Sequence, residues 1–70
     1  MIEVFKTNVQ EATEAKSLVT LLCRHFPDTK INFDLDDCDK ILRVEGQRFR
    51  PDSVILLVRE NGFRCAVLES

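Results

Sequence analysis

The stretch KINFDLDDCDKILRVE, residues 30–45, decides the fold. In residues 30–35 every second residue is apolar, which is the period of a strand with one buried face. Residues 36–39, DDCD, are typical of a turn, because aspartate side chains cap the backbone N–H groups of turns. Residues 40–45 then return as a second extended segment. The stretch therefore predicts two antiparallel strands joined by an acidic hairpin.

An amphipathic helix and a further strand precede this hairpin. Residues 12–26 place apolar side chains at three- and four-residue spacing, which predicts a helix running to about His25. Asn8, followed three residues later by Glu11, is typical of a helix cap with its reciprocal glutamate. Residues 2–6 alternate and predict a first strand.

A second helix and a last strand follow the hairpin. Pro51 suits the first position of a helix, where its missing N–H is no loss. Asn61 and Gly62 end that helix, with Gly62 as a left-handed cap, and residues 63–68 form the fourth strand. The order β-α-β-β-α-β predicts one α+β domain over residues 1–70. Its compact solution is the ferredoxin-like arrangement, a four-stranded antiparallel sheet with two helices on one face.

Composition and charge exclude several classes of partner. The chain has 70 residues, of which 44% are hydrophobic and 31% charged, so it is neither disordered nor a membrane protein. Its longest apolar run, residues 54–58, is far shorter than the ~20 residues of a membrane span. A formal net charge of -2 without a basic cluster argues against nucleic acid. With no signal-peptide pattern at the N-terminus, the three cysteines are expected to be reduced thiols of a cytoplasmic protein.

Three short motifs occur at a spacing along the chain that is typical of one protein family. The first helix ends in Phe26-Pro27-Asp28, an apolar hairpin follows, and Gly62-Phe63 comes after the second helix. Together they resemble the heavy-metal-associated domain of copper chaperones, metal-pumping ATPases and mercury-binding proteins. The resemblance covers nearly the whole chain and implies the same ferredoxin-like fold.

The residues that define the chemistry of that family are missing. Heavy-metal-associated domains hold a soft metal ion with the two thiolates of a Met-x-Cys-x-x-Cys motif at the mouth of the first helix. Counting back from Pro27 places Ala12 and Ala15 at the two cysteine positions and Gln10 at the methionine position. A methyl group has no lone pair and cannot coordinate a metal. Both alanines fit the apolar stripe of the helix, so we expect them to pack there, without metal or other cofactor.

Two of the remaining cysteines could in principle rebuild a metal site. In this topology Cys38, in the hairpin, and Cys65, early in the last strand, lie at the same end of the sheet as the lost motif. Cys23 and His25 lie at the opposite end. If Cys65 faces the helices, it is a small buried hydrophobe instead, as free cysteines often are. Residual copper or zinc binding, through Cys38 and Cys65 or with ligands from a partner, is therefore the alternative function.

The hairpin carries a cluster of acidic residues that suggests two further possibilities. Its members are Asp34, Asp36, Asp37 and Asp39. Oxygen ligands of this kind suit Ca²⁺ or Mg²⁺, but the cluster lacks the bend glycine and the distal glutamate of an EF-hand loop. We expect a solvated turn, which could also serve as a docking surface for a basic partner.

The face of the sheet away from the helices is the most informative surface. If Ile2 and Val4 point towards the helices, then Phe5, Ile41 and Leu68 point away from them. Such an apolar patch could be buried by packing sheet to sheet with a second copy or with another protein.

The chain offers no recognisable catalytic arrangement. His25 is its only histidine and has no nucleophile or orienting carboxylate at a familiar spacing. We therefore expect a small, non-enzymatic interaction or adaptor module. A regulatory ligand-binding module is a further possibility, although no residues specific for a ligand can be named.

Overall fold

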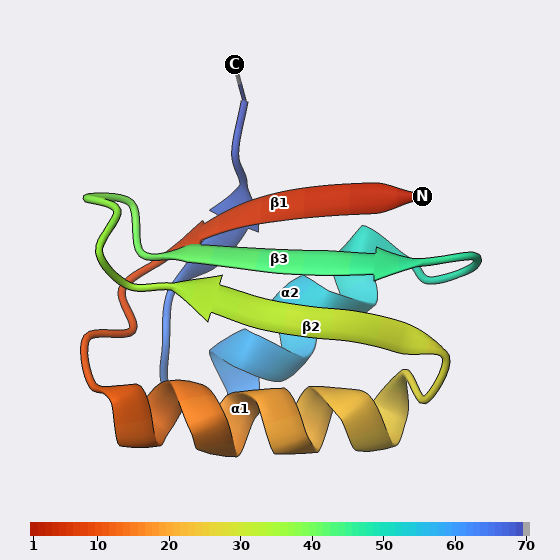
Figure 1. Ribbon diagram of the computed structural model, residues 1–70, viewed down its shortest axis with the longest axis horizontal. Coiled ribbons are helices and arrows are strands. Elements are labelled where there is room, and N and C mark those ends of the chain that lie inside the picture. Colours follow the sequence, from red (N-terminus) through yellow and green to blue (C-terminus); the bar gives the residue numbers. More distant parts are fainter. Residues whose placement is uncertain (70) are drawn as a thin grey trace.

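The structure is a four-stranded sheet with two helices packed against one of its faces (Figure 1). It is a computed structural model that describes residues 1–69. The elements are β1 (Ile2–Thr7), α1 (Ala12–His25), β2 (Thr29–Asp34), β3 (Ile41–Gly46), α2 (Pro51–Glu60) and β4 (Cys65–Val67). All paired strands are antiparallel, in the order β2-β3-β1-β4. The predicted α+β class and ferredoxin-like arrangement are confirmed.

The first helix begins at a different cap from the one expected. The N-cap is Glu11, whose backbone N–H donates to the carboxylate of Glu14 at 3.3 Å. Asn8 has another role, because its Oδ1 accepts a hydrogen bond from the backbone N–H of Arg64 at 2.7 Å. The cap lies three residues later than predicted because the connection first buries Val9 completely. The prediction for Asn8 was wrong, and this residue ties the β1–α1 connection to the segment before β4.

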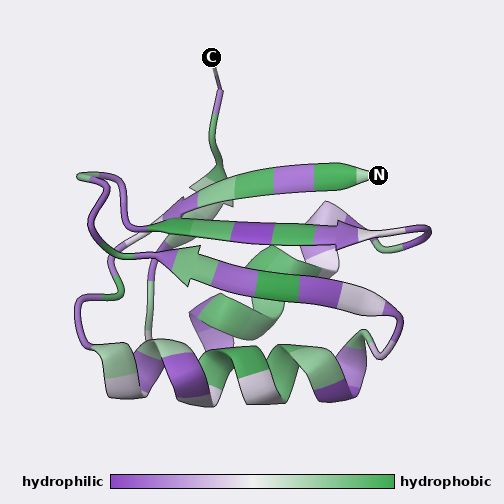
Figure 2. Ribbon diagram, in the orientation of Figure 1, coloured by the Kyte–Doolittle hydropathy of each residue, from purple (hydrophilic) through white to green (hydrophobic). Residues whose placement is uncertain are grey.

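The pleat of β1 is inverted relative to the prediction. Phe5 lies opposite Leu42 and is fully buried, whereas the side chain of Ile2 is 51% exposed. The expectation that Phe5 belongs to the outer face, with Ile2 and Val4 inside, was therefore wrong. Apolar residues occur on both sides of this strand, so hydropathy alone does not choose between its faces (Figure 2). The observed choice buries the larger aromatic ring and keeps the ammonium group of Lys6 in water.

The core lies between the sheet and the helices. Its main cluster consists of Phe5, Leu22, Leu42, Val44, Val54, Val58 and Cys65. A smaller cluster, at the N-terminal end of α1, consists of Val9, Ala15 and Leu18. Gly62 ends α2 with φ of 93°, the left-handed conformation predicted for it. Within residues 1–69, no helix has the length and hydropathy needed to span a membrane.

The inverted pleat of β1 can be tested by truncating one side chain on each face. We expect Phe5→Ala to lower the free energy of unfolding by about 3–5 kcal/mol, because it leaves a cavity in the main core cluster. Ile2→Ala, at a half-exposed position, serves as the matched control and should cost less than about 1 kcal/mol. Urea unfolding of the two variants measures both values. Similar losses in the two variants would contradict the observed pleat.

Candidate functional site

One end of the sheet gathers three segments that are distant in sequence. The backbone N–H of Thr7 donates to the carbonyl of Asp39 at 3.0 Å, and the Thr7 hydroxyl donates to the carbonyl of Lys40 at 2.6 Å. Thr7 also lies opposite Cys65 in the β1–β4 ladder. The end of β1, the β2–β3 hairpin and the start of β4 therefore meet, which places Cys38 and Cys65 at the same end of the sheet.

The two cysteines line one groove of about 560 Å³. The groove is also lined by three basic side chains, Lys6, Arg59 and Arg64. Their positive charges oppose the entry of a metal cation. Sequence reasoning did not identify this basic lining, because its members come from β1, the end of α2 and the segment before β4.

Burial makes the thiol of Cys65 a poor ligand. Cys65 is only 2% exposed, and desolvation by burial raises its pKa from 9.0 to about 11, although the positive charge of Arg59 acts in the opposite direction. Metal binding requires the thiolate, which is scarce near neutral pH when the pKa is raised in this way. Cys65 therefore packs as a small buried hydrophobic residue, as expected if its side chain faces the helices.

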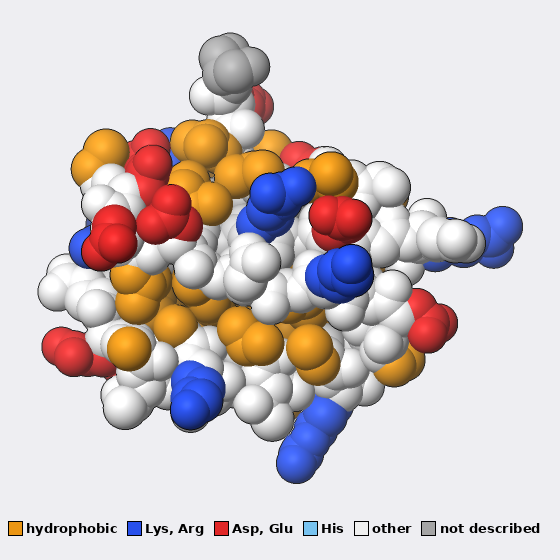
Figure 3. Space-filling model, in the orientation of Figure 1, with side chains coloured by type: hydrophobic (Ala, Val, Ile, Leu, Met, Phe, Trp, Pro, Cys, Tyr) orange, Lys and Arg blue, Asp and Glu red, His pale blue; other side chains and the backbone are white. Residues whose placement is uncertain are grey.

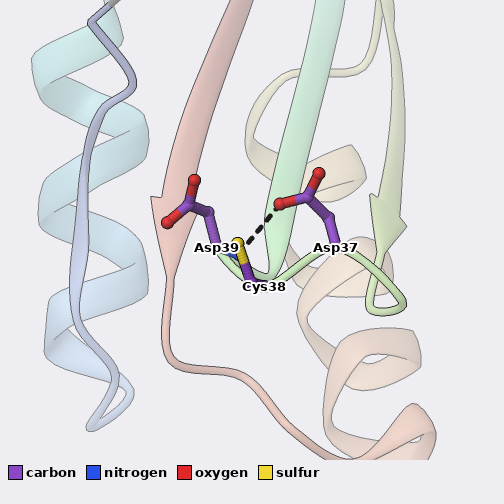
Figure 4. A group of neighbouring side chains, drawn as sticks. All are labelled: Asp37, Cys38 and Asp39. Carbon is purple, nitrogen blue, oxygen red and sulfur yellow. Dashed lines mark hydrogen bonds between the residues drawn. The ribbon is translucent and has the colours of Figure 1, made fainter.

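Cys38 lies instead between two carboxylates of the hairpin (Figure 4). The ligand atoms of Asp37, Cys38 and Asp39 lie within 4.8 Å of one another, and all three residues are exposed. Oδ1 of Asp37 accepts a hydrogen bond from the backbone N–H of Asp39 at 2.9 Å, drawn as the dashed line. Cys65 is not a member of this group. The fold thus brings the two cysteines to one groove without joining them in one ligand cluster.

The acidic hairpin has the hydrogen bonds of a solvated turn. Oδ1 of Asp34 accepts from the backbone N–H of Asp36 at 3.2 Å, which repeats the arrangement at Asp37. Nζ of Lys40 donates to the carbonyl of Leu35 at 2.9 Å and closes the turn. The four aspartates are exposed, and acidic side chains gather at this end in Figure 3. The carboxylates of Asp34 and Asp37 therefore serve the backbone of the turn, as expected from their residue type.

The two alanines at the start of α1 do not share one environment. Ala15 is 7% exposed and packs with Val9 and Leu18, as predicted. Ala12 is exposed at the first position of the helix, so the expectation that it packs in the apolar stripe was wrong. The difference follows from the later cap at Glu11, which makes Ala12 the first residue of the helix instead of an interior one.

The outer face of the sheet carries an apolar patch with a different membership from the predicted one. We define the outer-face patch as Ile2, Val4, Ile41, Ala66 and Leu68, all exposed or half-buried. Ile41 and Leu68 were predicted for this face, and their positions in the pleat agree with it. The backbone N–H of Leu68 donates to the carbonyl of Val4 at 2.9 Å, so the patch continues across the β1–β4 boundary.

Charged side chains lie within and beside this patch. Lys6 lies opposite Ala66, between β3 and β4, and Arg43 and Glu45 face the same way from β3. Nη2 of Arg43 and Oε1 of Glu45 lie 3.7 Å apart, with both side chains about half exposed. The outer face is therefore apolar in part and interrupted by solvated charges.

No protein family, no curated protein and no solved structure matches this chain. Function must therefore be argued from the surfaces of the molecule. These are the outer-face patch, the groove that contains the two cysteines and the acidic hairpin.

The buried thiol gives a test based on pH. Well below pH 9 the thiol is protonated in both the folded and the unfolded chain. As the pH rises from 9 to about 11, the unfolded chain ionises first, so the free energy of unfolding falls by at most about 3 kcal/mol. Urea unfolding between pH 7 and 11 should show this loss in the native chain and its absence in Cys65→Ala. The control Cys38→Ala, at an exposed position, should retain the loss, and an identical pH dependence in all three proteins would contradict burial of Cys65 as its source.

Proposed function

We propose that this chain is a small, non-enzymatic interaction module that binds another protein through the outer-face patch. The observation that carries the proposal is the one-sided arrangement of the helices, which leaves the other face of the sheet uncovered (Figure 1). An apolar patch that the protein does not cover itself is typical of an interaction surface. We propose that it acts in the cytoplasm, where its three free cysteines would remain reduced.

The composition of the outer face supports this role. Its apolar members are mostly β-branched or leucine side chains on a pleated surface, which favours packing against a flat apolar surface such as another sheet. Lys6 and Arg43 lie among the apolar members, and their long side chains can extend to solvent past a bound partner. Protein interfaces as a whole are about as polar as the rest of the protein surface, so these charges are compatible with an interface.

We further propose that the chain is a heavy-metal-associated domain that has lost its metal site. The ferredoxin-like fold supports this resemblance. The placement of Ala12 and Ala15, one turn apart at the start of α1, also supports it, because the family's thiolates occupy the mouth of the same helix. In this interpretation the fold is retained as a scaffold, while methyl groups replace the sulfur ligands.

Residual metal binding is a second candidate because Cys38 and Cys65 line the same groove. The basic lining of that groove and the raised pKa of Cys65 oppose it. We therefore favour the interaction module.

The outer-face patch can be tested by placing a charge within it. We expect Val4→Lys, at the centre of the patch and opposite Arg43, to abolish or strongly weaken binding of the protein partner, because the interface would bury an unpaired ammonium group. The matched control is Leu56→Lys, at a 60% exposed leucine of α2 that is not a member of the outer-face patch. Affinity capture from extracts of the source cells, followed by titration of the captured protein against each variant, measures the effect. Equal binding by both variants would contradict the proposal, as would equal loss.

Restoring sulfur at the start of α1 tests the family resemblance. We expect Ala12→Cys/Ala15→Cys to bind one Cu(I) ion per chain with sub-micromolar affinity, because these two positions lie at the mouth of α1, where the family places its thiolates. The matched control, Thr13→Cys/Lys16→Cys, keeps the spacing one position further along the same helix. Competition with a chromophoric Cu(I) chelator measures affinity, and the native chain should not bind at this level. Equal affinity in the two double variants would contradict the proposed positions, and tight binding by the native chain would favour residual metal handling.

A further inference from the structure

The strand β2 forms a long edge of the sheet that no other strand of the chain pairs with. The sheet order β2-β3-β1-β4 leaves β2 and β4 each paired on one side only. The strand β4 has 3 residues, whereas β2 has 6. Short edge strands offer little for another strand to pair with, so β2 is the edge suited to strand addition.

The hydrogen-bond pattern identifies which backbone groups of β2 point outward. The N–H of Gly46 donates to the carbonyl of Met1, and the N–H of Thr29 donates to the carbonyl of Phe26. The opposite residues Thr29 and Gly46 are therefore a non-hydrogen-bonded pair of the β2–β3 ladder. Because such pairs alternate with bonded ones along antiparallel strands, the N–H and C=O groups of Ile31 and Phe33 point to the open edge.

The residues of β2 are complementary to those of a second β2 that runs in the opposite direction. Lys30, Asn32 and Asp34 face the outer side of the sheet and are exposed, and Ile31 and Phe33 face the helix side. If two copies of β2 pair antiparallel about a two-fold axis at Asn32, Lys30 lies opposite the second copy's Asp34, and Ile31 lies opposite the second copy's Phe33. A parallel pairing in the same register would place Lys30 against Lys30 and Asp34 against Asp34.

The same antiparallel register satisfies the outward backbone groups. Ile31 and the second copy's Phe33 would exchange both of their hydrogen bonds, and the symmetry repeats this pair. Lys30 and Asp34 would then form a non-hydrogen-bonded pair, the kind in which opposite side chains lie closest. One register thus pairs the backbone, the charges and the apolar side chains together.

An apolar groove beside the edge leaves room for the side chains of a second strand. A space of about 370 Å³ lies between α1 and β2, lined by Ala15, Val19, Ile31 and Phe33 among others. Ile31 and Phe33 are only partly buried by their own chain. Figure 3 shows apolar side chains along this boundary between the sheet and α1. A second copy's Phe33 and Ile31 would enter the same layer and complete its packing.

We propose that two copies of this chain pair antiparallel through β2 and form one continuous eight-stranded sheet across a two-fold axis. The inferred interface is the sheet edge with its adjoining groove, a different surface from the outer-face patch, so both can be occupied in one assembly. Because each β2 edge pairs with the other across the two-fold axis, no free β2 edge remains, and the assembly stops at the dimer.

Charge reversal tests the proposed register. Sedimentation equilibrium should show a reversible dimer of the native chain. The variants Lys30→Asp and Asp34→Lys should each raise the dissociation constant at least tenfold, because each places like charges opposite one another twice. The double variant Lys30→Asp/Asp34→Lys should restore dimerisation at low salt. Arg48→Asp, in the exposed segment after β3, carries the same charge change as Lys30→Asp and should leave the dimer unchanged.

Amide exchange locates the interface independently of any substitution. Slower exchange of the Ile31 and Phe33 N–H groups at protein concentrations that favour the dimer is the expected result, followed by NMR. A native chain that stays monomeric at millimolar concentration would overturn the proposal. So would a dimer in which these two amides still exchange rapidly, or one that the single charge reversals do not weaken, since pairing would then occur through another surface such as the outer-face patch.

Discussion

The orientation of Phe5 is the constraint on which the rest of this structure depends. The strand β1 is central, between β3 and β4, so the direction of its pleat fixes which side chains of both neighbours enter the core. With Phe5 inside, Leu42 and Cys65 lie on the buried face, and Val4 and Ile41 lie on the open one. The burial of a thiol and the exposure of an apolar patch are thus two results of one choice of face.

The order of elements was predictable because each element carries its own local signal. The alternation in β2, the proline at the start of α2 and Gly62 at its end all act over a few residues. The face of β1 was not predictable from alternation, since its apolar residues fall on both sides. Charge does not decide it either, because Lys6 falls on one face and Glu3 falls on the face of Phe5, where it lies half-buried opposite Val44.

For the candidate sites too, some features could be predicted from the order of elements, and others depend on residues that are distant in sequence. The order of the elements alone was enough to place Cys38 and Cys65 at one end of the sheet. In an antiparallel sheet, the end of β1, the β2–β3 turn and the start of β4 all lie at the same end. The charge around them was not predictable, since Arg59 reaches the groove from a helix that is remote in sequence from β1. The free edge of β2 needed the strand order and the hydrogen-bond pattern, neither of which can be read from residue types.

The hydrogen bond between the Asn8 side chain and the backbone of Arg64 also has a consequence for the order of events during synthesis. It joins residues 56 positions apart, so it can form only after Arg64 has left the ribosome. The helix α1 and the β2–β3 hairpin depend on nearer contacts and can assemble earlier. Closure of the β1–α1 connection therefore follows the assembly of α1 and the hairpin, and a nascent chain exposes the β4 side of β1 until residues 65–67 emerge.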